Sequence, residues 1–244
     1  TGSGHEIVDS EEEAEAIVIN TCCFIHDAKE ESVNTILEMA EYKKTGKCKA
    51  LVVTGCMAQR YKEEITQEIP EVDAVLGTTS YGDIVKALNE VQAGHVFQEF
   101  RDINELPEDS GRRVLTTGGH FGYLKIAEGC DKHCTYCIIP SLRGSFRSVP
   151  EERLLAQAEY MASQGVKELI LVAQETTVYG TDLYGRKTLH ILLKKLCQIR
   201  GIRWIRVLYC YPEEIYDELI QVMKEEKKIC NYLDLPIQHA SDRI

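Results

Sequence analysis

The sequence predicts an α/β protein with two domains: an amino-terminal doubly wound parallel sheet, followed by a partial β/α barrel. Short unbroken apolar runs, typical of strands buried on both faces of a parallel sheet, alternate with amphipathic helical stretches. The chain has 244 residues, more than one domain usually needs. A turn-rich segment interrupts the alternation near the middle, which indicates a boundary between two domains.

The first domain is expected over residues 1–95. Apolar runs at 17–19, 51–53 and 74–76 predict strands, and stretches at 61–68 and 84–91 predict helices. A longer helix is expected from Asp27, which can cap it with Glu30 three residues later. Four of its apolar residues share one face: Val33, Ile36, Leu37 and Ala40. Strands joined by helices form right-handed βαβ units, which predicts a doubly wound sheet.

Residues 96–119 break this rhythm with turn-forming residues and are expected to be a linker. The second domain is expected over residues 120–244. Strands are predicted at 123–127, 169–172, 204–209 and 232–237, with helices opening at Pro150 and Pro212 and a leucine stripe between them. Four such repeats fit part of a β/α barrel.

Composition narrows the class of protein. Ten cysteines in a long chain, with no signal peptide in view, do not suit a small secreted disulfide scaffold. No apolar run approaches the roughly 20 residues that cross a bilayer, so we expect a cytoplasmic protein that does not bind membranes. The net charge of −11 suits a basic protein partner and argues against direct nucleic-acid binding by this chain, although acidic surfaces are common.

Both ends of the chain look cut. It begins at Thr1 without an initiator Met and stops at Ile244 directly after a strand-like run. We therefore expect a fragment of a longer protein, truncated at both ends.

A cysteine loop follows the first strand of the second domain. Residues 129–137 read Gly-Cys-Asp-Lys-His-Cys-Thr-Tyr-Cys, so three residues separate Cys130 from Cys134 and two separate Cys134 from Cys137. Thiolates are the ligands of iron–sulfur clusters, and three of them leave one iron of a four-iron cluster open to another molecule. Active sites of β/α barrels lie on the loops that follow the strands, so the position fits as well.

Other interpretations of this loop stay open. A structural zinc site would need a fourth ligand, for which His133 is the nearest candidate. Cys134 and Cys137 have the spacing of a dithiol redox pair, which would leave Cys130 unexplained. Unrelated buried cysteines are a third reading.

Two more cysteines follow strands of the first domain. Cys22 comes after the strand near residue 18, and Cys56 after the strand near residue 52. Ligands gather at the carboxyl ends of parallel strands, so these side chains are expected to meet at one edge. Each, taken alone, is equally well explained as an ordinary buried thiol.

The loop Cys-x-x-x-Cys-x-x-Cys, with Tyr136 before its last cysteine, resembles the radical S-adenosylmethionine superfamily. This resemblance implies a 4Fe-4S cluster on Cys130, Cys134 and Cys137 whose open iron binds the amino and carboxylate groups of S-adenosyl-L-methionine. An electron from such a cluster cleaves the cofactor to methionine and a 5′-deoxyadenosyl radical, which abstracts hydrogen from an unactivated carbon.

Residues 20–32 and 53–60 are similar to the amino-terminal domain of methylthiotransferases, through Asn-Thr-Cys-Cys-Phe-Ile-His and Val-Thr-Gly-Cys-Met-Ala-Gln-Arg. In that family three cysteines hold a second, auxiliary 4Fe-4S cluster, which carries the sulfur to be inserted. The resemblance assigns Cys22 and Cys56 to two of these ligands and leaves Cys23 aside. The third ligand belongs to an earlier strand that this fragment is expected to lack, so the fragment alone can be inactive.

Residues 22–32, 137–144, 171–176 and 232–241 look like the RimO branch of this family. This implies a transferase that adds a methylthio group to the β-carbon of an aspartate in ribosomal protein S-twelve, with a flavodoxin or ferredoxin as electron donor. The alternatives are a MiaB-like transfer-RNA adenosine methylthiotransferase and a non-catalytic iron–sulfur or zinc module. The transfer-RNA branch would be expected to carry a Gln-Ser-Gly sequence where residues 238–241 read Gln-His-Ala-Ser.

No catalytic residue beyond the cluster ligands is assigned. The residues expected to contact the cofactor are Tyr136, Gln174, Glu175 and Arg206. Arg143 and Arg147, which follow the cysteine loop, have the fork geometry to orient a carboxylate.

Overall fold

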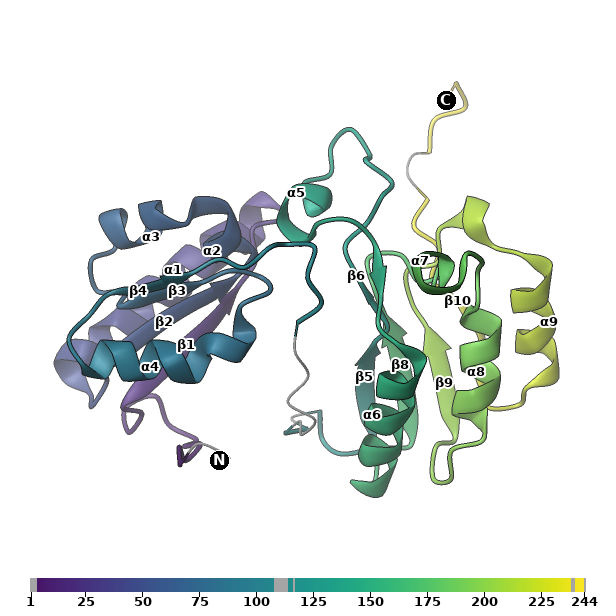
Figure 1. The fold of residues 1–244 in the computed structure, drawn as a ribbon, viewed down its shortest axis with the longest axis horizontal. Coiled ribbons are helices and arrows are strands. Elements are labelled where there is room, and N and C mark those ends of the chain that lie inside the picture. The colour runs from purple at the N-terminus through teal and green to yellow at the C-terminus, as the bar shows by residue number, and fades with distance from the viewer. Residues whose placement is uncertain (1–3, 108–113, 116, 238–239, 244) are drawn as a thin grey trace. The chain divides into compact units, whose positions relative to one another are not determined.

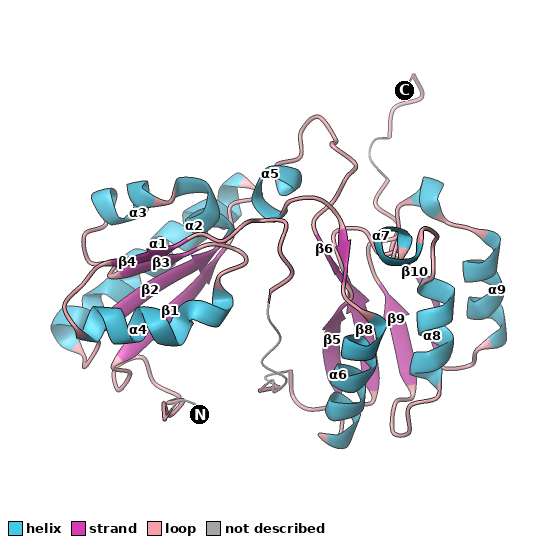
Figure 2. Ribbon diagram, viewed as in Figure 1, coloured by secondary structure: helices cyan, strands magenta, loops and turns pink. Residues whose placement is uncertain are grey.

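The computed structural model describes residues 4–107, 114–115, 117–237 and 240–243. The chain divides into two compact units, each shown in Figures 1 and 2. Unit 1 comprises Thr1–Ser110 together with His133–Gly144, and unit 2 comprises Gly111–Lys132 together with Ser145–Ile244. Each unit is built on a four-stranded parallel sheet with helices packed on it, which confirms the predicted α/β class.

The sheet of unit 1 is entirely parallel and its strands follow chain order without reversal along the described residues. The strands are β1 (Ala16–Thr21), β2 (Ala50–Gly55), β3 (Ala74–Leu76) and β4 (Phe97–Glu99). The helices are α1 (His26–Thr45), α2 (Cys56–Tyr61), α3 (Glu63–Glu68) and α4 (Ile84–Gln92), with a 3-10 turn η1 (Tyr81–Asp83). Helices cover both faces of this sheet, which is the layering that a doubly wound domain requires (Figure 1).

The sequence of β2 explains why it lies at the centre of that sheet. Leu51 and Val53 point into the core formed with α1, α2 and α3, whereas Ala50 and Val52 point into the core formed with α4. All of these side chains are buried, because successive residues of a strand face opposite sides and both sides are covered. An uninterrupted apolar run is therefore what this position needs.

Helix α1 differs in detail from the prediction. It begins at His26, one residue before the predicted cap Asp27, and no side chain caps it. Asp27 lies instead in the first turn, where its charge interacts favourably with the helix dipole. Ile36 and Ala40 are buried as predicted, but Leu37 is 49% exposed and lies off the buried face.

Two other regions of unit 1 depart from expectation. The helix predicted at 61–68 is α3, which begins two residues later, and the preceding helix α2 was not predicted. Lys62, with a positive φ of 44°, separates the two helices. Strand β4 lies inside the segment predicted to be a linker and pairs with β3. A search for apolar runs does not detect this strand, because Gln98 and Glu99 are polar.

The sheet of unit 2 is also parallel, in the order β10-β9-β8-β5. Its strands are β5 (Phe121–Lys125), β8 (Glu168–Val172), β9 (Trp204–Val207) and β10 (Ile229–Leu233). Its helices are α6 (Glu151–Ser163), α7 (Thr181–Tyr184), α8 (Leu189–Cys197) and α9 (Asp217–Glu225), with a 3-10 turn η2 (Pro212–Glu214). Strands β6 (Ala127–Glu128) and β7 (Arg147–Ser148) form a separate antiparallel pair.

One face of this second sheet is buried beneath α6, α8 and α9, and the leucine stripe of α8 lies within that core as predicted. The other face carries exposed aromatic side chains, among them Tyr123, Trp204 and Tyr232. The last strand, β10, begins three residues earlier and ends four residues earlier than the predicted 232–237, and it pairs with β9 through Ile229 and Leu233. Pro236, at the far end of the predicted run, has no N–H to donate to a strand.

None of the described helices is long and apolar enough to cross a membrane.

The core of unit 2 predicts the effect of a truncation. Leu171 on β8 is fully buried, so Leu171→Ala should lower the free energy of unfolding by about 2–5 kcal/mol through lost burial and a residual cavity. Ile220 on α9 is exposed, so Ile220→Ala should change it by less than about 0.5 kcal/mol. Urea unfolding of the two variants measures both values, and equal midpoints would contradict the assignment of this core.

Candidate functional site

Cys22 and Cys56 lie at the same edge of the unit 1 sheet. Strands β1 and β2 pair in parallel register from Ala16↔Ala50 to Thr21↔Gly55. Both strands end at this last pair. The residue that follows is Cys22 after β1 and Cys56 after β2. The structure thus places Cys22 and Cys56 at equivalent positions after paired strands, and their role as cluster ligands stays a prediction.

The backbone of Cys22 is held from helix α1. Its N–H donates to Oγ of Ser32 at 3.0 Å, and its carbonyl oxygen lies 2.9 Å from the same hydroxyl. Ser32 also lies 2.8 Å from the carbonyl oxygen of Ala28, within its own helix. These contacts fix the main chain at Cys22 while its side chain stays exposed.

Gly55 sets the geometry before Cys56. Its φ of 96° and ψ of −159° fall in a region that only glycine populates readily. A Cβ atom at this position would lie 2.4 Å from the carbonyl oxygen of Thr21 and 2.8 Å from the nitrogen of Thr21. Only glycine at position 55 therefore allows the ends of β1 and β2 to approach closely, directly before Cys22 and Cys56.

This constraint predicts a large effect of one methyl group. Gly55→Ala should lower the free energy of unfolding by at least about 2 kcal/mol, because the added Cβ meets backbone atoms and the backbone angles are strained. Gly82→Ala is the matched control, since a Cβ there meets nothing within 4 Å. Urea unfolding should separate the two variants clearly, and a wild-type midpoint for Gly55→Ala would disprove the constraint.

Cys23, next to Cys22, is a buried thiol. Burial, and then the nearby Cys56 sulfur, raise the pKa of Cys23, whereas the charge of Arg60 lowers it. Cys23 is part of the core of unit 1, and its place outside the ligand set stays a prediction.

The segment His133–Gly144, which carries Cys134 and Cys137, packs on unit 1 through the short helix α5 (Ile139–Arg143). Leu142 is buried in the core beneath the sheet, and its carbonyl oxygen accepts a hydrogen bond from Thr78 Oγ1 at 2.9 Å. Thr78 follows β3, so it lies at the same carboxyl edge as the cysteines after β1 and β2. Sequence reasoning missed Thr78, although the rule that located Cys22 and Cys56 applies equally to it.

The three cysteines of the loop are placed as follows. Cys130 belongs to unit 2, whereas Cys134 and Cys137 belong to unit 1, where Cys137 N–H donates to the Cys134 carbonyl oxygen at 2.9 Å. His133 has a positive φ of 47° at the start of that segment. Tyr136 is 70% exposed.

Cys130 lines a cavity of about 220 Å³ within unit 2. Most of the other lining residues are charged or polar and come from loops that follow strands. They are Asp131, Lys132, Phe146, Glu175, Val178, Thr181, Lys187 and Glu214. Glu175, expected from sequence to contact a cofactor, therefore lies in the same cavity as a predicted cluster ligand.

Two lysines in this cavity share one carboxylate. Lys187 Nζ lies 2.8 Å from Glu214 Oε2, and Lys132 Nζ also bonds to Glu214. Hydrogen bonds from Lys132 and then Lys187 lower the pKa of Glu214. Lys132 also lies 4.6 Å from the centre of the Tyr211 ring. Sequence reasoning missed this network of two lysines and a glutamate. The sequence offers one clue to it, which is that Lys132 lies two positions after Cys130.

Glu175 is 3% exposed. One of its carboxylate oxygens accepts hydrogen bonds from Thr177 N–H at 2.9 Å, from the Thr177 hydroxyl and from Tyr211 N–H at 3.4 Å. Burial raises the pKa of Glu175, and the bonds from Thr177 and Tyr211 and the charge of Lys132 oppose the rise. Desolvation is the largest of these causes, so the ionised carboxylate is held at a cost in stability.

That cost gives a pH dependence. A carboxyl whose folded pKa is raised stabilises the fold below its unfolded pKa and loses this stabilisation as pH rises through the folded value. Between about pH 4 and about pH 7, the free energy of unfolding of wild type should fall relative to that of Glu175→Gln. Urea unfolding at the two pH values measures the difference. A gap between the proteins that stays constant with pH would contradict the raised pKa.

The other predicted cofactor contacts have contrasting surroundings. The side-chain oxygen of Gln174, two residues after β8, is buried and accepts no hydrogen bond from the described residues. An unpaired buried acceptor of this kind is stabilised by a donor on a bound molecule.

Arg206 instead donates from Nε to Glu168 Oε1 at 2.7 Å and lies 5.4 Å from the centre of the Tyr232 ring. The structure thus engages Arg206 within the sheet, and its contact with a cofactor stays a prediction.

The chemistry of the donors fits iron–sulfur clusters. All the predicted ligands are cysteine thiols that are exposed or only partly buried, whereas Cys48, Cys197 and Cys210 are buried. Across the residues that the structure describes, no three His, Cys, Asp or Glu side chains converge as ligands of one metal ion.

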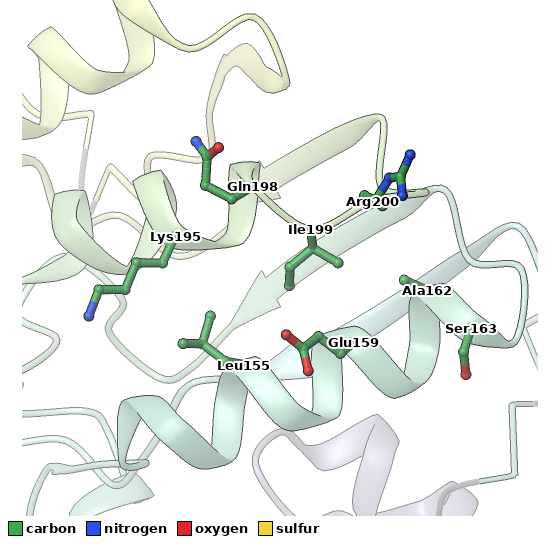
Figure 3. A pocket seen from close by; sticks show the side chains of 8 residues that line it. All are labelled: Leu155, Glu159, Ala162, Ser163, Lys195, Gln198, Ile199 and Arg200. Atoms are coloured by element: carbon green, nitrogen blue, oxygen red, sulfur yellow. The ribbon is translucent and has the colours of Figure 1, made fainter.

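A larger cavity than the one beside Cys130 lies between α6 and α8 of unit 2 (Figure 3). It has a volume of about 590 Å³ and is open to solvent. Its lining residues are Leu155, Glu159, Ala162, Ser163, Lys195, Gln198, Ile199 and Arg200. None of the predicted site residues contributes to it, so size alone does not locate the site.

Two protein-family models match the chain. Residues 1–77 match the model described as uncharacterized protein family UPF0004, and residues 124–244 match the radical SAM superfamily. Cys22 and Cys56 fall within the first match, and Cys130, Cys134 and Cys137 within the second.

Curated relatives match almost the whole chain. It is 66% identical over 241 residues to "Ribosomal protein uS12 methylthiotransferase RimO" of Lachnoclostridium phytofermentans, covering 99% of this chain and 55% of that protein. A protein of the same name from Clostridium botulinum is 52% identical, covering 98% of this chain and 54% of the relative. The chain thus spans about half the length of these relatives.

A solved structure shares the fold. The radical S-adenosylmethionine methyltransferase TsrM from Kitasatospora setae aligns with a TM-score of 0.61 at 11% identity, covering 93% of this chain and 49% of that one. At this identity the likeness supports the fold alone.

Proposed function

The chain belongs to the RimO-like methylthiotransferases of the radical S-adenosylmethionine superfamily, and on this basis we propose the activity of the longer protein that it represents. That protein adds a methylthio group to the β-carbon of an aspartate in ribosomal protein S-twelve. The observation that carries the proposal is the pair of cysteine sets, one in each matched region, with Cys22 and Cys56 at one sheet edge.

The proposed ligands are divided by role. Cys130, Cys134 and Cys137 would hold the 4Fe-4S cluster that, together with S-adenosyl-L-methionine, supplies the radical needed to break an unactivated carbon–hydrogen bond. Cys22 and Cys56 would hold two irons of an auxiliary 4Fe-4S cluster. The β-carbon of aspartate bears no leaving group, so polar displacement there is closed and hydrogen abstraction is required.

The proposed cofactor contacts are Tyr136, Gln174, Glu175 and Arg206, of which Glu175 lines the cavity beside Cys130. Gln174 offers a buried acceptor that lacks a partner among the described residues, which suits a donor on the cofactor. Glu175 offers a buried carboxylate, whose negative charge a cofactor ammonium would stabilise. Tyr136 and Arg206 complete the proposed set, Tyr136 because of its place in the cysteine loop and Arg206 because of its place on β9.

The proposed partners follow from charge and chemistry. A net charge of −11 suits a basic ribosomal protein better than a phosphate backbone, which favours the protein substrate over a transfer RNA. A flavodoxin or ferredoxin is proposed as the electron donor. We also propose a cytoplasmic location, because the proposed substrate is a ribosomal protein.

The activity is tested with the full-length protein under anaerobic conditions, with S-adenosyl-L-methionine, reductant, sulfide and a peptide of the S-twelve loop. Mass spectrometry should find one methylthio group on the aspartate. Cys134→Ala should abolish both 5′-deoxyadenosine and the modified peptide. Cys56→Ala should retain 5′-deoxyadenosine and lose the modified peptide, because it affects only the auxiliary site.

Cys48→Ala is the matched control, since Cys48 is a buried thiol outside both sets, and it should retain both products. Formation of 5′-deoxyadenosine without any added mass on the peptide would disprove the proposed substrate. Modification of a transfer-RNA adenosine in a parallel assay would favour the other branch of the family.

A further inference from the structure

The guanidinium of Arg143 contacts the sulfur of Cys56. Arg143 Nε donates a hydrogen bond to Cys56 Sγ at 3.3 Å, and both residues lie in unit 1. The contact joins residues 87 positions apart in the chain. Arg143 ends helix α5, six residues after Cys137, so the same short segment carries two predicted ligands of one cluster and touches a predicted ligand of the other.

Both partners of this contact are held by their backbones. On one side, Gly55 fixes the turn into α2 and thereby the position of Cys56. On the other side, Leu142 is buried in the unit 1 core and accepts the hydrogen bond of Thr78. The N–H of Gly144, whose φ is 73°, closes the end of α5 by donating to the Pro140 carbonyl oxygen at 3.0 Å.

A cationic donor favours the more negative state of the sulfur that it touches. For a free cysteine that state is the thiolate, the form that binds metal. For a ligated cysteine it is the more reduced state of the cluster, because hydrogen bonds to cluster sulfurs and nearby charge help to set the reduction potential. A guanidinium cannot lose its charge at physiological pH, so this influence is constant.

We propose that Arg143 is a positioning residue that orients Cys56 and raises the reduction potential of the auxiliary cluster that Cys56 ligates. This inference rests on the proposed function, because it needs an auxiliary cluster at Cys56. It adds a role for the segment after Cys137: besides following two ligands of the radical cluster, it places a fixed positive charge against the sulfur of Cys56.

The test uses the full-length protein in which Cys130, Cys134 and Cys137 are all changed to Ala, so that only the auxiliary cluster can form. In this background, Arg143→Gln should lower the midpoint potential, measured by a redox titration followed by electron paramagnetic resonance. At a fixed potential the ratio of reduced to oxidised cluster should fall about tenfold, or about 59 mV for a one-electron couple. Arg143→Lys keeps the positive charge but loses the planar guanidinium. Its midpoint potential should therefore lie between that of the Arg143 protein and that of Arg143→Gln.

Lys44→Gln is the matched control. Helix α1 begins at His26, shortly after Cys22, and Lys44 lies in its last turn. Lys44 is therefore about 27 Å from His26 along the helix axis. The variant removes the same charge from the same unit and should leave the potential unchanged. A potential that Arg143→Gln and Lys44→Gln leave equally unchanged would overturn the inference.

Thr78→Val provides an independent measure that retains the charge of Arg143. It removes the hydroxyl that anchors Leu142, so amide hydrogen exchange over residues 139–144 should become faster and the potential should fall in the same direction. Faster exchange with an unchanged potential would overturn the inference even if Arg143→Gln failed to fold. Absence of iron and sulfide from the triple-alanine protein would instead overturn the auxiliary cluster of the proposed function.

Discussion

The parallel pairing of β1 with β2 is the constraint on which the arrangement of unit 1 depends. Six consecutive pairs, from Ala16↔Ala50 to Thr21↔Gly55, bring both strands to an end at the same level. The two cysteines that follow are therefore placed by main-chain hydrogen bonds before any side-chain contact is considered. Gly55 makes this possible, because the carbonyl oxygen of Thr21 occupies the space that any other side chain would need. Helix α2 begins at Cys56, directly after the last of these pairs.

Unit 2 applies the same rule through a different set of residues. Its strands β5 and β8 pair in parallel from Phe121↔Glu168 to Lys125↔Val172. The segments after them supply Cys130 and Glu175, which line one cavity. A parallel sheet has all its carboxyl ends on one edge, so polar groups far apart in sequence converge there without a dedicated scaffold. The sheet topology thus determines where the cysteines and Glu175 lie in each unit. Their side chains determine which chemistry is available there.

Sequence reasoning predicted the parts that depend on local pattern. Apolar runs located β2, β3 and β8, and the leucine stripe located α8, because burial on both faces of a sheet or along one helix face leaves a clear period. It missed β4, in which Gln98 and Glu99 are polar, and it missed helix α2, which the positive φ of Lys62 separates from α3. It named the cysteines of the candidate site, and their role as ligands stays a prediction. It did not locate the contact of Arg143 with Cys56, because such a contact between distant positions leaves no periodic trace.

The candidate site separates the groups that shape it from the groups that would react. Ser32, Gly55 and Thr78 hold the carboxyl edge of unit 1 through backbone contacts, and none of them carries a group suited to bind iron. The thiol of Cys22 is exposed, so its removal costs the fold little buried surface, whereas the neighbouring thiol of Cys23 is buried in the core. At this strand end, a predicted ligand and a residue of the core are therefore adjacent in the chain. Arg143 is the exception: its charge acts on the sulfur of Cys56, while Leu142 beside it belongs to the core. At that one point a change in packing is also a change in the electrostatics of a predicted ligand.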